Sequence, residues 1–360
     1  MTSEVKPFFL KNPVNFPLCL APMVGLSHFA LRQLIREYMP QNAWTLWPTE
    51  MLNSRRLPFE KVGETPETFR GPDENGLVPQ ILGNEEFAIA KSLEKLTEWG
   101  AEGIDINMGC PVQKALKHNY GVALMGDPMY AAEVVRMTVK HSVIPVSVKL
   151  RSVSQGLDES PDKLLEFVER LTDAGAKWIT LHPRTAEQKR RDSADWEQIR
   201  YLKSKLKCPV IGNGDIQTVD DVLERLKQAQ CDVVMSGRAL AARPWMVWQL
   251  GEALGFESSE LYKEKKPPST PQEEAQEYGR SLLRLSYILW NSYQKIGASE
   301  SMALRKLKFH IKTTHVWLDY GHALSASVST AATIEDFQEK VSQFFLNSDL
   351  SMTSRTELRQ

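Results

Sequence analysis

The sequence contains few cysteines, and none of them belongs to a closely spaced pair. Cys19, Cys110, Cys208 and Cys231 are spread over a chain of 360 residues. This spacing excludes the dense disulfide framework of small secreted proteins and the C-x-x-C pairs of structural zinc sites. We therefore expect free thiols, a reducing environment and a cytoplasmic location.

Long hydrophobic runs and net charge are also lacking. No uncharged apolar segment approaches the roughly 18 residues that a membrane-spanning helix requires, and residues 1–16 do not have the basic and apolar regions of a secretory signal. The formal net charge of −1 by itself indicates no particular class of partner. We expect a soluble, monomeric protein without a membrane partner.

Two signatures of common binding sites are absent. The sequence has no G-x-G-x-x-G string, which marks doubly wound dinucleotide-binding sheets. It has no H-x-x-x-H or paired-carboxylate spacing near the loops where a site is expected. We therefore expect neither a doubly wound sheet nor a bound metal.

What the sequence does have is a repeated alternation of short apolar runs with helical patterns. The apolar runs predict strands at Leu18–Ala21, Trp44–Trp47, Val78–Leu82, Gly103–Asn107, Val146–Leu150, Trp178–His182, Val210–Gly212 and Asp232–Ser236. Most are apolar along their whole length, as in a parallel sheet covered on both faces. Eight such units predict an α/β fold, a (β/α)8 TIM barrel.

Helical patterns lie between most of these runs and continue beyond them. Barrel helices are predicted over Phe29–Tyr38, Glu85–Trp99, Met129–His141, Pro161–Ala174, Trp196–Leu206 and Thr218–Ala229. Three further helices are predicted over Gln276–Tyr293, Ser301–Trp317 and Ile334–Phe345. We divide the chain into a barrel domain (residues 1–255), a linker (256–275), a small all-helical C-terminal domain (276–346) and a disordered tail (347–360).

A cysteine follows the fourth predicted strand in an unusual setting. Cys110 stands between Gly109 and Pro111, directly after the run Gly103–Asn107. Glycine and proline end the strand abruptly, which places the thiol on a loop, whereas free cysteines are usually buried inside an element. Barrel active sites are built from these strand-end loops, so Cys110 is a candidate catalytic residue. The alternative is a loop cysteine without a role.

Polar residues and glycines end several other predicted strands. The turns Asn213-Gly214-Asp215 and Gly237-Arg238 follow the seventh and eighth strands, where barrels hold phosphate groups with backbone N–H groups. Lys149 and His182 end apolar strands, so their polar atoms are expected at the barrel mouth. Gln80 is polar within a buried strand and needs hydrogen-bond partners, which a flavin could supply. Together these residues predict a phosphorylated ligand.

In order and spacing, these strand-end residues resemble the tRNA-dihydrouridine synthases. The shared strings are Ala21-Pro22-Met23, Gln80, the N-x-G-C-P-x-x-K signature from Asn107 to Lys114, Val148-Lys149-Leu150-Arg151, His182-Pro183-Arg184-Thr185, Asn213-Gly214-Asp215-Ile216 and Gly237-Arg238-Ala239. The resemblance covers the barrel, from about Pro17 to Pro244. Two departures are Tyr120, where the family has a small residue, and Pro183, where it has glycine.

The resemblance implies an FMN-binding barrel that reduces the C5=C6 bond of a uridine in tRNA, with NADPH or NADH as electron donor. It implies that Cys110 supplies the proton that C5 of the uracil ring needs. The implied cofactor contacts are Pro22, Met23, Val24, Gln80, Lys149, His182, Asn213, Gly214, Asp215, Gly237 and Arg238. The implied substrate contacts in the barrel are Asn107, Lys114 and Arg184.

The predicted helical domain is rich in basic residues. Between Tyr278 and His315 there are seven Arg or Lys residues and one acidic residue, Glu300, with aromatic residues interleaved. A near-neutral protein that concentrates positive charge in an appended domain is typical of polyanion binding. We therefore predict tRNA contacts at Arg305, Lys306 and Lys308; the alternative is a solvated helix face.

Two other functions fit part of this pattern. One is an FMN-dependent barrel that acts on a free pyrimidine, like the dihydroorotate dehydrogenases. The other is an RNA-binding protein built on an inactive barrel. The basic helical extension disfavours the first, and the presence of both Cys110 and Lys149 disfavours the second.

Overall fold

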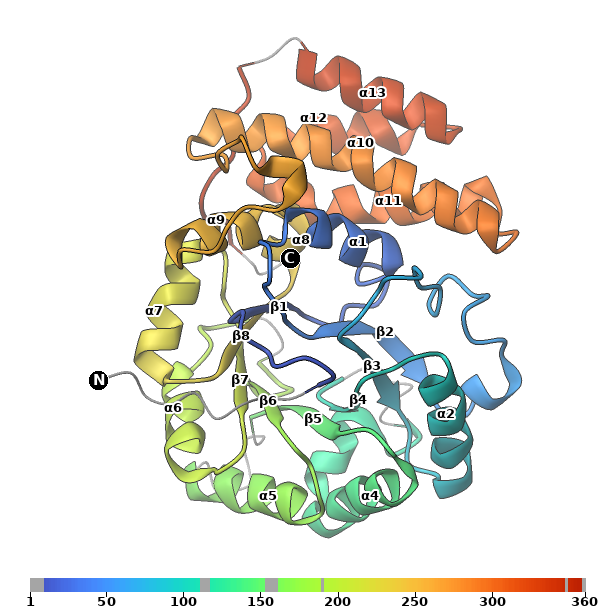
Figure 1. Ribbon diagram of the computed structural model, residues 1–360, viewed down its shortest axis with the longest axis vertical. Helices are drawn as coiled ribbons and strands as arrows, with labels where there is room; N and C mark the ends of the chain where they lie inside the picture. The colour runs from blue at the N-terminus through green and yellow to red at the C-terminus, as the bar shows by residue number, and fades with distance from the viewer. Residues whose placement is uncertain (1–9, 111–116, 153–160, 189–190, 347–348, 358–360) are drawn as a thin grey trace.

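The chain forms an eight-stranded barrel with a group of helices packed against one side (Figure 1). The computed structural model describes residues 10–110, 117–152, 161–188, 191–346 and 349–357. The strands are β1 (Leu18–Leu20), β2 (Trp47–Asn53), β3 (Leu77–Leu82), β4 (Ile104–Met108), β5 (Val146–Arg151), β6 (Ile179–His182), β7 (Val210–Asn213) and β8 (Val233–Ser236). They pair in parallel in the order β1-β8-β7-β6-β5-β4-β3-β2, so the predicted TIM barrel is confirmed.

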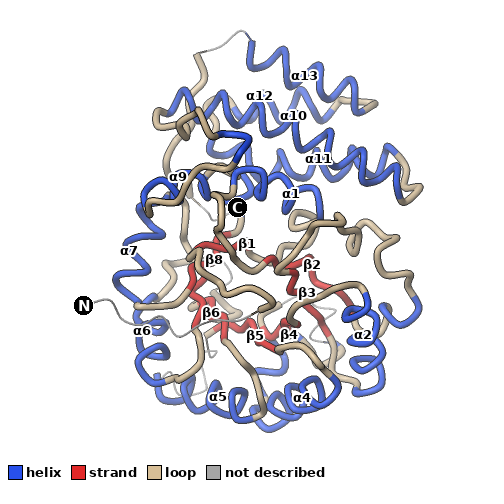
Figure 2. The backbone as a smooth tube through the Cα atoms, in the orientation of Figure 1, coloured by secondary structure: helices blue, strands red, loops and turns tan. Residues whose placement is uncertain are grey.

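The strands form an inner ring, and most of the barrel helices lie outside it (Figure 2). These helices are α1 (Phe29–Tyr38), α2 (Glu86–Glu98), α4 (Pro128–His141), α5 (Pro161–Asp173), α6 (Trp196–Lys205), α7 (Val219–Ala229), α8 (Arg238–Ala242) and α9 (Met246–Ala253). The six predicted barrel helices match within one residue at each end; α8 and α9 were not predicted. In the described ranges, no helix combines the length and apolar character that crossing a membrane requires.

The second strand differs from its prediction. The sequence predicts Trp44–Trp47, whereas β2 runs over Trp47–Asn53 and so continues through Pro48. Pro48 pairs with Val78 and Met51 with Gln80, so β2 advances three residues while β3 advances two. This extra residue is a β-bulge, which lets the strand pass a proline that would otherwise interrupt the ladder. Thr49 and Glu50 therefore lie inside the strand, not after it.

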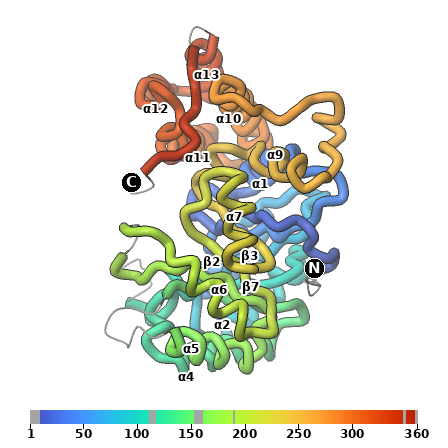
Figure 3. Tube along the Cα trace, turned by 90° about the vertical axis from the view of Figure 1, so that its left-hand side faces the viewer, coloured from blue at the N-terminus to red at the C-terminus, as the bar shows by residue number. Residues whose placement is uncertain are grey.

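The helical domain consists of four helices stacked on the α1 and α9 side of the barrel (Figures 1 and 3). They are α10 (Pro271–Lys295), α11 (Glu300–Thr314), α12 (Gly321–Ser329) and α13 (Ile334–Leu346), and α12 was not predicted. The predicted linker end at residue 275 is wrong, because α10 begins at Pro271. Thr270 and Glu273 form a reciprocal capping box there, and proline fits the first helical position.

Residues of the predicted linker are packed between the two parts. The Tyr262 ring stacks on Tyr38 of α1 at a centroid distance of 4.9 Å and contacts Trp248 of α9 at 4.6 Å. The Tyr38 hydroxyl donates to Glu277 of α10. The stacked rings therefore hold this segment against the barrel, and the Tyr38–Glu277 bond joins the barrel directly to α10. The division at the linker stays a prediction about folding units.

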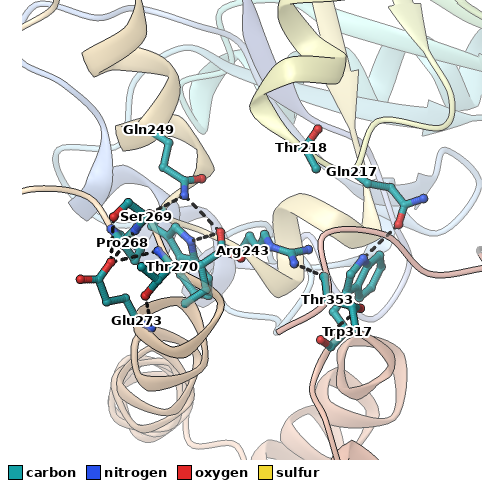
Figure 4. A network of polar contacts seen from close by, with 12 residues as sticks. Gln217, Thr218, Arg243, Gln249, Pro268, Ser269, Thr270, Glu273, Trp317 and Thr353 are labelled. Carbon is teal, nitrogen blue, oxygen red and sulfur yellow. Dashed lines mark hydrogen bonds and ion pairs between the residues drawn. The ribbon is translucent and has the colours of Figure 1, made fainter. Parts of the chain in front are cut away.

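The predicted disordered tail is partly ordered, so that prediction is wrong for residues 349–357. Leu350 and Met352 are buried, and Met352 forms an antiparallel bridge with Leu318. The Arg243 guanidinium donates to the Thr353 carbonyl, beside the contact between Trp317 and Gln217 (Figure 4). Buried Leu350 and Met352 together with polar contacts hold this segment against both the barrel and the helical domain, which composition alone did not indicate.

Acid pH is expected to destabilise the fold through buried histidines near α1 and α11. Burial lowers the pKa of His310 to about 4, and burial together with Lys306 lowers the pKa of His28 well below its usual value. In the unfolded chain both titrate near pH 6.5, so the unfolded state binds more protons between about pH 4 and 6.5. The free energy of unfolding should therefore fall as the pH drops through that window, which urea titrations from pH 7.5 to 4.5 would measure. An unchanged pH slope in His310→Leu would contradict this assignment.

Candidate active site

A cavity opens where the first strand and the fifth to eighth strands end. Its volume is about 220 Å³. The predicted cofactor residues that line it are Pro22, Met23, Lys149, His182, Asn213, Gly214, Asp215, Gly237 and Arg238. Arg151 and the predicted substrate residue Arg184 also line it. The structure thus brings nine of the predicted cofactor residues together, while their roles stay predictions.

The two remaining predicted cofactor residues lie elsewhere. The Val24 side chain is 62% exposed and does not line the cavity. Gln80 is buried on β3, and its amide is bonded to neighbouring side chains: Nε2 donates to Asp105 (2.7 Å) and Oε1 accepts from Asn107 (2.7 Å). These two contacts use one of the two N–H donors of the Gln80 amide and leave the other available for a further hydrogen bond. The Gln80 amide therefore holds the side chains of Asp105 and Asn107, and its predicted contact to the cofactor stays a prediction.

Lys149 presents a cation to the cavity. It is the fourth residue of β5, and no hydrogen bond or ion pair to its ammonium is found among the described residues. Burial and the nearby Arg151 lower the pKa of Lys149 to about 8, although Asp105 opposes this shift. A buried cation without a bonded partner is costly, and an anionic or electron-rich ligand would relieve that cost.

His182 is held neutral by its surroundings. Burial, followed by the charges of Lys149 and Arg151, lowers the pKa of His182 to about 2. Arg184 Nη1 lies 3.3 Å from His182 Nε2, and a guanidinium can only donate. His182 Nε2 is therefore the acceptor, and the neutral ring carries its proton on Nδ1.

Arg184 is a buried residue whose polar atoms face the protein. Its guanidinium donates to both carboxylate oxygens of Asp215 at 2.7 Å and to the Asp192 carbonyl at 2.6 Å. The Asp215 carboxylate also accepts from the Ala194 N–H at 2.7 Å. A free carboxylate would repel a phosphate, and this pairing neutralises it. Arg184 and Asp215 thus satisfy each other's side chains in this structure, and their predicted contacts to substrate and cofactor stay predictions.

The turn after β7 requires its glycine. Gly214 has φ +138°, and a methyl group there would come within 2.7 Å of the Ala194 Cβ. The next residue, Asp215, also has a positive φ of +55°. Glycine adopts such a φ at no steric cost, so it sets the course of the turn that borders the cavity.

A chain of hydrogen bonds inside the barrel holds the Cys110 loop. Asn107 Oδ1 accepts from the backbone N–H groups of Gly109 (3.1 Å) and Cys110 (2.9 Å). Asn107 in turn donates to Gln80, Gln80 donates to Asp105, and Ser147 donates to Asp105 at 2.7 Å. This network connects β3, β4 and β5, and it fixes the backbone that carries the half-buried Cys110 thiol. Asn107 is a loop-positioning residue as well as a predicted substrate contact.

The sequence analysis assigned no role to Asp105, Ser147 or Arg151, although Arg151 belongs to the shared string Val148–Arg151. Arg151 Nε donates to the Gly109 carbonyl at 2.9 Å, which clamps the Cys110 loop from β5. Burial raises the pKa of Asp105, and its bonds to Gln80 and Ser147 oppose that shift. The available signal was the alternation of polar residues Asp105 and Asn107 within an otherwise apolar strand.

The remaining predicted substrate residues have different environments. Lys114 lies outside the described residues. Arg305 is exposed on α11. Lys306 instead pairs with Glu50 of β2 at 2.9 Å, and Lys308 donates to the carbonyls of Ser329 (2.9 Å) and Ala331 (2.7 Å). The ammonium groups of Lys306 and Lys308 thus bind protein atoms in this structure, and tRNA contacts at the three α11 cations stay predictions.

The two departures from the family pattern lie at the barrel mouth. Tyr120 is buried beside Leu82, and its ring stacks on His118 at a centroid distance of 5.6 Å. Pro183 follows His182, and its carbonyl accepts from the Asp195 N–H at 3.1 Å. Neither residue is among those that line the cavity.

Comparison with known proteins agrees with this architecture. Residues 19–342 match the family model described as "Dihydrouridine synthase (Dus)". A "Probable tRNA-dihydrouridine synthase" of Rhizobium leguminosarum bv. phaseoli is 36% identical over 233 residues, covering 63% of this chain and 69% of that protein. A "Probable tRNA-dihydrouridine synthase 1" of Synechocystis sp. is 33% identical over 231 residues, covering 64% and 63%. Histamine dehydrogenase from Rhizobium sp. 4-9 shares the fold alone, with a TM-score of 0.50 and 13% identity over 69% of this chain and 48% of that chain.

Proposed function

Because the chain belongs to the dihydrouridine synthase family, we propose that it reduces the C5=C6 bond of uridines in tRNA, using FMN and electrons from NADPH or NADH. The observation that carries this proposal is the cavity lined by Lys149, His182 and the Gly214 and Gly237 turns, with the Cys110 loop bonded to the same barrel interior. The family match removes the basis for the free-pyrimidine alternative. A cytoplasmic monomer remains part of the proposal.

The residues of the cavity fit FMN. Gly214 and Gly237 line the cavity on the turns after β7 and β8, where barrels commonly hold a phosphate with backbone N–H groups. Lys149 offers an ammonium without a bonded partner among the described residues, which suits the electron-rich edge of an isoalloxazine ring. His182 offers an Nδ1–H donor to a ligand oxygen. Bound FMN would supply the reducing equivalents, and the protein would supply position and protons.

Cys110 is proposed to deliver the proton to C5 of the uracil ring. A general acid must hold its proton within hydrogen-bond reach of the accepting atom. Asn107 accepts from the backbone N–H groups of Gly109 and Cys110, and Arg151 donates to the Gly109 carbonyl. These bonds fix the backbone next to the thiol. The Asn107 side chain therefore restricts where the thiol can lie, which lowers the entropy cost of the proton transfer.

The exposed cations of the helical domain are proposed to bind tRNA phosphates. Of the seven basic residues between Tyr278 and His315, four bind protein groups: Arg280, Arg284, Lys306 and Lys308. For Lys295, Arg305 and Lys312, no ion pair exists within the described part of the chain. We therefore expect the phosphate contacts of this domain at these three residues, with a salt dependence that follows counterion release.

The purified protein is expected to be yellow and to reduce tRNA. Heating should release a flavin with the absorbance spectrum of FMN, because no covalent attachment is proposed. Incubation with NADPH and tRNA from cells without dihydrouridine should produce dihydrouridine, measured by mass spectrometry of the digested tRNA. An apo-protein that takes up no FMN, or a flavin-loaded protein that leaves tRNA unchanged, would refute the proposal. The second result would favour an RNA-binding protein on an inactive barrel.

A further inference from the structure

Glu50 is a buried carboxylate beside the barrel mouth that the proposed chemistry does not use. Its side chain is 2% exposed. It lies in β2 between Pro48 and Met51, where the bulge shifts the register against β3. A bulge changes the direction in which the neighbouring side chains point, and bulges are frequent next to active sites. Glu50 thus lies at the bulge itself.

The two carboxylate oxygens of Glu50 join two distant segments. Oε2 accepts from the backbone N–H of Gly25, in the loop between β1 and α1, at 2.7 Å. Oε1 accepts from Lys306 Nζ of α11 at 2.9 Å, and the Lys306 side chain is itself only 19% exposed. One buried carboxylate thus binds both the loop and the helical domain through charge-assisted hydrogen bonds.

The loop that Glu50 holds is a wall of the cofactor cavity. Pro22 and Met23 line the cavity, and Met23 packs against the turn after β8: a methyl group on Gly237 would lie 3.1 Å from the Met23 sulfur. Gly25 has φ +84° and is covered by the ring of Phe309 from α11, 2.8 Å from where a Cβ would be. Helix α11 therefore contacts this loop directly through Phe309 and is joined to it indirectly through Lys306 and Glu50.

We propose that Glu50 is a positioning residue that fixes the Met23–Gly25 loop at the cofactor cavity, and that Lys306 couples the helical domain to this loop through the same carboxylate. The proposal rests on the proposed function, since the cavity is taken to hold FMN. Placement of the helical domain and affinity for the cofactor are then linked by thermodynamic reciprocity. A substitution at Lys306 on α11 should therefore change the affinity of the cavity for the cofactor, although Lys306 does not line the cavity.

The test uses Glu50→Gln and Lys306→Met in the full-length protein. Arg284→Met is the matched control, because Arg284 and Glu37 also form an ion pair between α10 and the barrel helix α1, at 2.7 Å. The first readout is amide hydrogen exchange of residues 22–27 in the cofactor-free protein. The second is FMN affinity, followed by the fluorescence of free FMN.

Glu50→Gln and Lys306→Met should speed exchange at Gly25 by about three- to tenfold and weaken FMN binding by about tenfold, as expected for loss of one charge-assisted contact. Arg284→Met should change neither. A variant that combines Glu50→Gln with Lys306→Met should have a loop exchange rate closer to wild type than Lys306→Met alone. The reason is that the combined variant does not leave an unpaired buried carboxylate. Equal effects of Lys306→Met and Arg284→Met on loop exchange, or no effect of either, would overturn the proposal. The exchange readout decides this even if the protein binds no FMN, which would instead refute the proposed function.

Discussion

Replacing Cys110 with alanine is expected to abolish efficient tRNA reduction while leaving the cofactor in place. The thiol is needed only when the uracil ring accepts a proton, so FMN content and NADPH oxidation should stay close to wild type. A positioned general acid typically contributes on the order of 10²–10⁴-fold to a rate. Dihydrouridine formation under single-turnover conditions should therefore fall by about that factor, while anaerobic bleaching of the flavin by NADPH continues.

Cys208 offers a matched control for this experiment. It is half-buried and precedes β7, so it lies at the opposite end of the barrel from the cavity. Cys208→Ala should keep wild-type rates in both half-reactions. If Cys110→Ala reduces tRNA as fast as wild type, another group donates the proton, and Cys110 serves only as a loop residue.

The second large effect is expected at Lys149. Lys149→Met keeps most of the side-chain volume but removes the cation from the cavity. A hydrogen bond to a charged group contributes about 1.5–3 kcal/mol, so FMN affinity should fall by roughly 10- to 150-fold. Fluorescence titration of the apo-protein with FMN would measure this loss. Undiminished affinity in Lys149→Met would exclude contact between the ammonium and the cofactor.

The pH dependence of FMN affinity gives Lys149 an independent signature. Its pKa in the free protein is lowered to about 8, so the ammonium is present below about pH 8 and is lost above it. An electron-rich ligand favours the charged form, which raises this pKa in the complex, so affinity should decrease as the pH rises above about 8. Arginine keeps its charge throughout that range, and Lys149→Arg should bind FMN with a flatter pH profile.

The sequence by itself determined the barrel and the set of residues around its mouth. Parallel strands buried on both faces need near-continuous apolar runs, so most strands are visible locally, and β5 begins at the residue that the pattern indicated. The exception is β2, whose polar residues and proline hide it from this pattern. Parallel strands in a barrel end at one rim, so chain order alone predicted that Lys149, His182 and Asn213 converge. The family match followed from the same residues, because these strand ends hold the chemistry.

Tertiary structure alone decided how those residues are held and which charges remain available. Lys306 and Lys308 are basic neighbours of Arg305 in the sequence, yet Lys306 pairs with Glu50 and Lys308 binds two carbonyls at the C-terminal end of α12 and just beyond it. Composition marked residues 349–357 as disordered, while Leu350 and Met352 find apolar cover far away in the sequence. Propensity and periodicity report on neighbours within a few residues, whereas the bulge at Glu50 and these pairings form between segments up to 256 residues apart. Which side chains pair is decided only when the whole chain has packed. The reason is that the burial of a side chain and the charges around it depend on segments distant in the sequence.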